Sequence, residues 1–267
     1  MKQVAAVARV LMFVVLYVAV MFAVNAVLYQ GAIYAPLHAF VQRNATIVMA
    51  AADLVALLLF AVLLPLFGTT LVRIGSFNRW NTSQVLPVIG LGLSLGVFIL
   101  SFTRIPLIAE VAPSIANLVT FVAQGELLWL VLLNSAIIGT LFEEWLFRGI
   151  IYNSLLEKFN SMVAIIGQAL LFGVVFMDVV VGSFAALGAI LYALVRYFTG
   201  SLWPVLITHA ASTTTIIVLS LLIDGTDSGV AMKMLIVSVL ILVGCMAAIW
   251  RNGRRRSLDV SITAVGK

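Results

Sequence analysis

Residues 126–157 read ELLWLVLLNSAIIGTLFEEWLFRGIIYNSLLE. This run is almost entirely apolar, and it is longer than the roughly 20 residues that a helix needs to cross a bilayer. In lipid, a helix satisfies all of its backbone polar groups internally. The run therefore predicts a membrane-spanning helix, with the charged residues Glu143, Glu144 and Arg148 near its middle.

The rest of the chain resembles this stretch in composition. Of its 267 residues, 64% are hydrophobic and only 9% are charged, whereas soluble domains average about 25% charged residues. The sequence thus predicts an all-α polytopic membrane protein. We expect about eight transmembrane helices, near 5–28, 46–67, 84–103, 126–157, 162–179, 183–198, 202–223 and 231–250, with a short interfacial helix or structured loop at 104–125.

Basic residues predict the orientation of these helices. Lysine and arginine concentrate in cytoplasmic loops, and here they flank the first helix, separate the second from the third and follow the last one. The loop from Asp224 to Asp227 has none. Both termini are therefore expected in the cytoplasm, in a prokaryotic plasma membrane. The excess of 15 basic over 10 acidic residues is explained by this anchoring, so no nucleic-acid partner is expected.

Several other residues have structural interpretations. The spacing Gly92-x-x-x-Gly96 permits two helices to pack closely. Asp53, inside the second predicted helix, is expected to hydrogen-bond a neighbouring helix, and Arg196 is expected to mark the end of its own. The single cysteine, Cys245, excludes a disulfide framework.

Charged groups at membrane depth are costly and often functional. On a regular helix, Glu144 and Arg148 are four residues apart and can pair directly. Glu143 then points about 100° away and is left without that partner, so it is available as a general base or acid. The alternative is that all three residues form one buried ion-pair cluster that holds helices together.

His209 is the second candidate. It follows the run Gly200-Ser201-Leu202-Trp203-Pro204, in which the proline suits the first turn of a helix. A single histidine inside a membrane helix is often a core residue that hydrogen-bonds a hydroxyl or carbonyl. The only other histidine, His38, is expected in a loop between the first two helices.

Together these motifs resemble the CaaX protease and bacteriocin-processing (CPBP, or Abi) family of intramembrane endopeptidases. The first family motif, E-E-x-x-x-R, corresponds to Glu143, Glu144 and Arg148, followed by Gly149. The third motif, H-x-x-x-N on a helix opened by a Gly-Ser-Leu-Trp run, begins at His209. The resemblance covers roughly 126–215. It implies that Glu143 activates water, that His209 stabilises the oxyanion, and that Glu144, Arg148 and the position of Thr213 support them.

Two positions depart from the family pattern. The second motif, F-x-x-x-H, starts at Phe172, but its histidine position is Phe176, which cannot transfer protons. The asparagine of the third motif is replaced by Thr213, which offers a hydroxyl in place of an amide. Asp178 compensates for Phe176 only if the helix ends nearby and the carboxylate turns back toward the site.

We expect three parts of the chain: N-terminal helices and an interfacial segment at 1–125, a CPBP-like core at 126–223, and a last helix with a basic cytoplasmic tail at 224–267. One hypothesis is a glutamate-dependent protease that cleaves a peptide or protein presented from the membrane. The other is a catalytically impaired member, a pseudoprotease that serves as a binding, immunity or scaffold protein. A transporter predicts a polar pathway across the bilayer, whereas the polar residues here cluster. The ligand set is too thin for zinc, so no metal or other cofactor is expected.

Overall fold

The computed structural model describes residues 2–28, 35–223 and 228–265, with no side chains described for Lys2 or beyond Gly253. All regular elements in these ranges are helical. The helices before the central run are α1 (Lys2–Leu28), α2 (Ala35–Arg43), α3 (Thr46–Leu63), η1 (Leu64–Phe67), α4 (Leu71–Gly75), η2 (Thr82–Gln84), α5 (Val85–Thr103), α6 (Pro106–Val111) and α7 (Pro113–Ala123). Those that follow are α8 (Leu128–Val131), η3 (Leu132–Gly139), α9 (Thr140–Glu144), η4 (Trp145–Ile151), α10 (Tyr152–Leu156), α11 (Ser161–Val175), α12 (Val179–Thr199), α13 (Leu202–Leu222) and α14 (Ser228–Val265).

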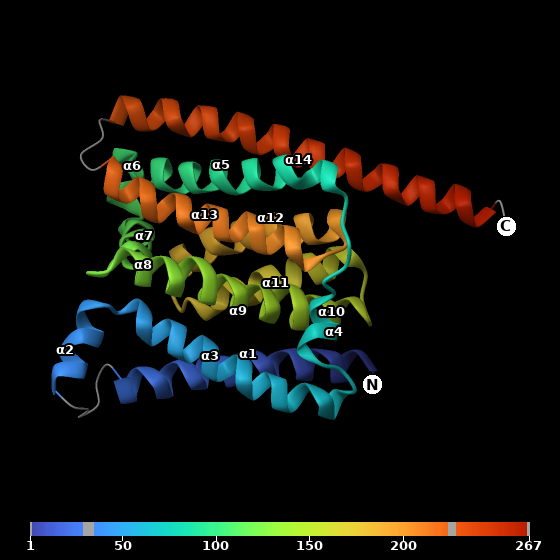
Figure 1. The fold of residues 1–267 in the computed structure, drawn as a ribbon, viewed down its shortest axis with the longest axis horizontal. Coiled ribbons are helices and arrows are strands. Elements are labelled where there is room, and N and C mark those ends of the chain that lie inside the picture. The colour runs from blue at the N-terminus through green and yellow to red at the C-terminus, as the bar shows by residue number, and fades with distance from the viewer. Residues whose placement is uncertain (1, 29–34, 224–227, 266–267) are drawn as a thin grey trace.

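The prediction of a polytopic helical membrane protein is confirmed. Within the described residues, seven helical segments are long and apolar enough to span a bilayer. The eighth predicted span corresponds to α11, which has 15 residues and is therefore about 22 Å long at 1.5 Å per residue. This is shorter than the roughly 30 Å hydrocarbon core. α11 nevertheless runs back along α12 (Figure 1).

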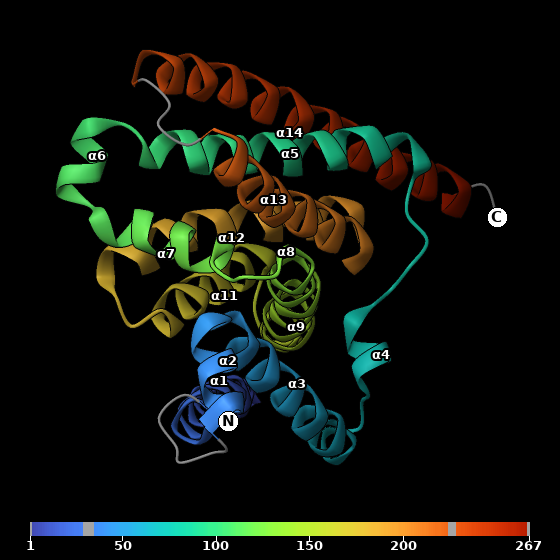
Figure 2. The ribbon, with the colours of Figure 1, turned by 60° about the vertical axis from the view of Figure 1, so that its left-hand side comes forward.

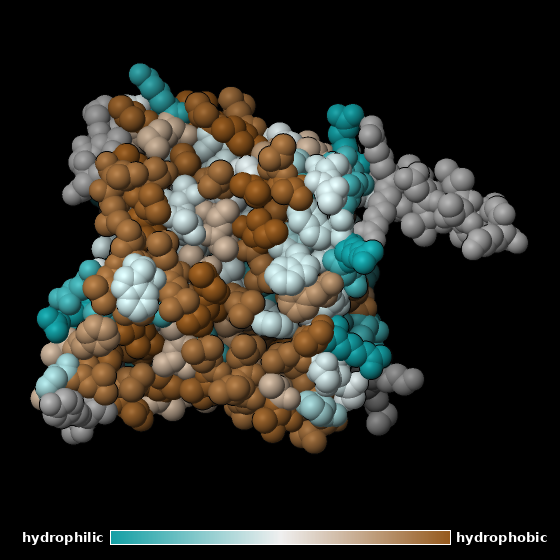
Figure 3. All heavy atoms as spheres, viewed as in Figure 1, coloured by the Kyte–Doolittle hydropathy of each residue, from teal (hydrophilic) through white to brown (hydrophobic). Residues whose placement is uncertain are grey.

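The helices are stacked in layers (Figures 1 and 2). α14 covers α5, α5 covers α13, and the central run from α8 to α10 lies between α13 and the α1–α3 pair. Figure 3 shows a largely apolar outer face, with hydrophilic residues gathered mainly toward the helix ends. The arrangement suits a protein whose outer surface contacts lipid.

Both ends of the chain lie at the same end of this bundle (Figure 1). Arg9 there pairs with Glu157, with 2.8 Å between Nη2 and Oε2. The turn between α12 and α13 is fixed at the same end, because Asn78 donates to the Gly200 carbonyl at 3.0 Å and accepts from Ser201 Oγ at 2.8 Å. The acidic loop at Asp224 to Asp227 lies outside the described residues.

The close contact between α5 and α13 confirms the packing interpretation of the glycine motif. A Cβ atom at Gly92 would lie 2.4 Å from the Thr208 carbonyl oxygen, and one at Gly96 would lie 2.6 Å from the Ser212 carbonyl oxygen. Only the missing side chains allow the two backbones to approach this closely. The helix that carries His209 is therefore held on one side by direct backbone packing.

Two local predictions need correction or detail. His38 does not lie in a loop, because residues 35–43 form α2, and its ring Nε2 lies 3.4 Å from Gln42 Nε2 one turn later. The stretch 104–125 contains two short helices, α6 and α7, each opened by a proline at its first turn. Such prolines suit a helix start because the missing N–H has no partner there in any case. Arg196 lies one turn before Gly200, which ends α12 with a φ of 68° as a left-handed cap, as predicted for a helix end.

Candidate active site

The predicted site lies on a helix with an unusual backbone. From Leu128 to Leu156 the chain is continuously helical, but α9 is flanked by two π-helical segments, η3 and η4. A π-helix bonds residue i to residue i+5, which redirects the side chains that follow, and such segments occur often at functional sites. Thr140 Oγ1 lies 3.5 Å from the Ser135 carbonyl, five residues earlier. The α-helical turn that carries both glutamates is thus bounded on each side by π-helical backbone.

Glu144 and Arg148 form a buried pair, as their spacing predicts. Arg148 Nη1 donates to Glu144 Oε1 at 3.0 Å, and neither side chain is exposed. Arg148 also donates to the Ala189 carbonyl at 3.2 Å, and its guanidinium lies between the rings of Phe172 and Tyr192 at 5.1 and 5.2 Å. The charge of Arg148 is therefore compensated by a carboxylate, a carbonyl and two aromatic rings, which connects the central helix to α11 and α12.

His209 bridges the two glutamates. Its Nδ1 lies 2.7 Å from the same Oε1 atom of Glu144, and its Nε2 lies 3.8 Å from Glu143 Oε2. Because the Glu144 carboxylate accepts a hydrogen bond from Arg148, Nδ1 is best assigned as a donor to it. Nε2 then points toward Glu143. Glu144 therefore has two polar partners, Arg148 on its own helix and His209 on α13.

Exposure separates the members of this cluster. Glu144 and Arg148 are fully buried, whereas the side chain of Glu143 is 23% exposed and that of His209 is 14% exposed. The outer pair of Glu143 and His209 therefore reaches the protein surface in part, while the inner pair does not. This division suits a cluster in which the inner pair positions groups and the outer pair meets a substrate.

The comparison with protein families agrees with these positions. The model described as type II CAAX prenyl endopeptidase Rce1-like matches residues 125–215. The chain carries an Rce1-like segment. Searches of curated proteins and of solved structures gave no match. The Rce1-like segment begins just before α8 and ends within α13, so it contains Glu143, Glu144, Arg148 and His209.

Phe176 stands at the end of α11 in this Rce1-like segment. It is partly buried at the edge of the main hydrophobic core, and its ring packs edge-on against Phe172 at 5.4 Å. The helix ends directly before it, and Met177 follows with a φ of 53°. The phenyl ring of Phe176 thus packs against the ring of Phe172. It has no group that can transfer a proton to or from the glutamates.

Asp178 does not take the place of the missing histidine. α11 does end near it, as the hypothesis requires, but its Oδ1 accepts a hydrogen bond from the Val181 backbone N–H at 2.8 Å. This contact caps the N-terminus of α12, the usual role of an aspartate at this position. Thr213, the other departure, lies one helical turn beyond His209 on α13 and is 8% exposed. It is therefore on the same helix face as the histidine.

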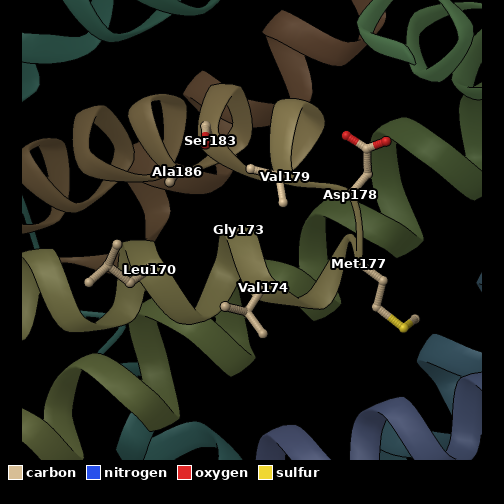
Figure 4. A pocket seen from close by; sticks show the side chains of 9 residues that line it. Leu170, Gly173, Val174, Met177, Asp178, Val179, Ser183 and Ala186 are labelled. Atoms are coloured by element: carbon tan, nitrogen blue, oxygen red, sulfur yellow. The ribbon is translucent and has the colours of Figure 1, made fainter.

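The groove in Figure 4 lies apart from the cluster. It has a volume of about 350 Å³ between α11 and α12 and is lined by residues such as Leu170, Gly173, Asp178 and Ala186. Neither Glu143 nor His209 contributes to it. Within the described residues, no group of three histidine, cysteine, aspartate or glutamate side chains is arranged to hold a metal ion.

Two site residues were missed at the level of sequence. The Tyr192 ring stacks on the His209 ring at 4.5 Å with an interplanar angle of 22°. Gln168 donates to the Ala189 carbonyl at 3.1 Å and so shares that acceptor with Arg148. No charge or motif distinguishes these two residues in the sequence, so only the packing of α11 and α12 identifies them.

Proposed function

We propose that this protein is an intramembrane endopeptidase that cleaves a peptide or protein presented from the membrane, with Glu143 as the general base. The observation that carries the proposal is the convergence of Glu143 and His209, 3.8 Å apart and both partly exposed, within a segment of an endopeptidase family. At this separation a single water molecule can hydrogen-bond both groups.

The proposed mechanism is hydrolysis by an activated water. Glu143 removes a proton from water while the water oxygen attacks the substrate carbonyl carbon. The oxyanion that forms is stabilised by a hydrogen bond from the Nε2–H of His209. This step uses the imidazolium form of His209, because its Nδ1–H donates to Glu144. Glu143 then gives the proton to the leaving amine nitrogen as the carbon–nitrogen bond breaks. Glu144, which contacts both Arg148 and His209, holds the imidazole in the orientation that this step needs.

The alternative is a pseudoprotease that keeps the fold and the ion pair but acts as a binding, immunity or scaffold protein. One observation favours it: Phe176 packs into the aromatic core, where the second family motif has a histidine. A general acid or base typically contributes about 10²- to 10⁴-fold to a rate. The loss of one such group therefore weakens hydrolysis strongly if nothing else handles the proton.

A cleavage assay with purified protein in lipid nanodiscs and a library of membrane-anchored peptides tests the proposal. The wild type is expected to cleave, and Glu143→Gln is expected to lower the rate by about 10²-fold or more. Glu126→Gln is the matched control, because Glu126 is half-exposed and, among the described residues, forms an ion pair only with Arg43, at 3.4 Å. If the wild type cleaves nothing and Phe176→His creates activity, the protein is a decayed enzyme and the proposal is wrong.

A further inference from the structure

A second buried carboxylate lies close to the proposed base. Tyr17 of α1 donates its hydroxyl hydrogen to Asp53 Oδ1 of α3 at 3.1 Å, and the two residues are 4% and 3% exposed. The interhelical hydrogen bond predicted for Asp53 is therefore confirmed. Both residues lie outside the Rce1-like segment at 125–215.

The pair faces the helix that carries Glu143. The Tyr17 ring packs on Phe142 with 4.6 Å between centroids, and Phe142 directly precedes Glu143. A Cβ atom at Gly139 would lie 3.6 Å from Asp53 Oδ2, so this oxygen points at the helix one turn before Glu143. Gly139 and Glu143 are four residues apart, so they lie on the same face of the helix, and the Glu143 side chain leans back toward the Asp53 carboxylate.

The other charged groups nearby are already engaged. Arg148 pairs with Glu144, and His209 contacts both Glu144 and Glu143. Among the described residues no lysine, arginine or histidine forms an ion pair with Asp53. Asp53 is buried and Glu143 is only partly exposed. Two carboxylates that lie close together in such surroundings do not both ionise easily, and they commonly share one proton, as in the aspartic proteases.

We propose that Asp53, held in place by Tyr17, shares a proton with Glu143 and acts as its proton partner in place of the histidine that Phe176 replaces. Asp53 acts through Glu143, so it is a positioning residue. The pair holds one proton at rest and two after Glu143 has taken a proton from water. It returns to one when Glu143 protonates the leaving amine. The part of this inference that concerns the reaction rests on the proposed function.

Infrared spectroscopy tests the shared proton without any need for activity. At neutral pH the wild-type protein is expected to show the carbonyl stretch of a protonated carboxylic acid, and both Asp53→Asn and Glu143→Gln are expected to shift or remove it. Asp178→Asn is the control, because Asp178 caps α12 in a different part of the molecule and is expected to leave the band unchanged. A spectrum that Asp53→Asn does not alter overturns the inference.

The cleavage assay tests the role in the reaction. Asp53→Asn is expected to lower kcat by about tenfold or more with little change in KM, and Phe176→His is expected to restore part of the loss in the double variant. A merely structural aspartate would not be rescued in this way, so absence of rescue overturns the role. If Asp53→Asn does not fold, Tyr17→Phe replaces it, because it keeps the ring on Phe142 and removes only the hydroxyl. A wild type that shows the infrared band and no cleavage contradicts the proposed function and supports the shared proton.

Discussion

The two faces of α13 pack by opposite means. Toward α5 the contact is between backbones, with the Gly92 and Gly96 positions directly against the Thr208 and Ser212 carbonyls. Toward α9 the contact is ionic and passes through His209 to Glu143 and Glu144. The first face fixes where the helix lies, because the two backbones approach directly there. The second face presents groups that can exchange protons. α13 thus combines a backbone contact with α5 on one side and an ionic contact with α9 on the other.

The largest effect is expected from removing a charge in the ionic contact between α13 and α9. Glu144→Ala removes the carboxylate that compensates Arg148 and leaves a fully buried guanidinium without its ion pair, which typically costs about 3–5 kcal/mol. Thermal unfolding in detergent, followed by circular dichroism, measures the loss. Glu157→Ala is the matched control, since its pair with Arg9 is half-exposed and such pairs contribute about 1 kcal/mol or less. Equal destabilisation by the two variants would show that burial of the pair is not decisive.

A smaller loss is expected at the backbone contact between α5 and α13. In Gly92→Ala the new Cβ would lie 2.4 Å from the Thr208 carbonyl oxygen, so α5 and α13 must separate, at a typical cost of about 1–3 kcal/mol for overpacking. Because Thr208 adjoins His209, the cleavage rate is expected to fall as well. Gly188→Ala in α12 is the control: nothing lies within 4 Å of its Cβ position, and replacing a helical glycine there is expected to be neutral or stabilising. A Gly92 variant as stable as the control would contradict the close packing.

The sequence predicts the backbone contact between α5 and α13 better than the ionic contact between α13 and α9. Long apolar runs and the Gly92-x-x-x-Gly96 spacing are sufficient for the helices and for one close contact, because length and residue size alone decide them. Glu144 and Arg148 are likewise related by a local spacing. The partner of Glu144 on α13 is not local, and it depends on how two distant helices approach each other.

The sequence places the two glutamates at different angles on one helix, but it does not show that both lie near one residue of a distant helix. A regular helix places Glu143 about 100° from Glu144, yet both side chains reach the His209 ring. Which carbonyl a backbone N–H selects depends on the surrounding packing, and the residue pattern of η3 and η4 does not reveal it. For the same reason the sequence gives Asp53 an interhelical hydrogen bond without identifying Tyr17 as the donor.

The smallest effect is expected from the ring behind His209. Tyr192 stacks on His209 and also lies 5.2 Å from the Arg148 guanidinium. It therefore packs against both residues that contact Glu144. Tyr192→Leu removes the stacking, and a double-mutant cycle with His209→Ala isolates the coupling between the two rings. Aromatic pairs of this kind contribute about 0.5–1.5 kcal/mol beyond the area they bury. Tyr192→Phe keeps the ring and is expected to keep the coupling. A coupling near zero in the Leu cycle would mean that Glu144 alone orients the imidazole, and that the rigid contact with α5 supplies the remaining restraint.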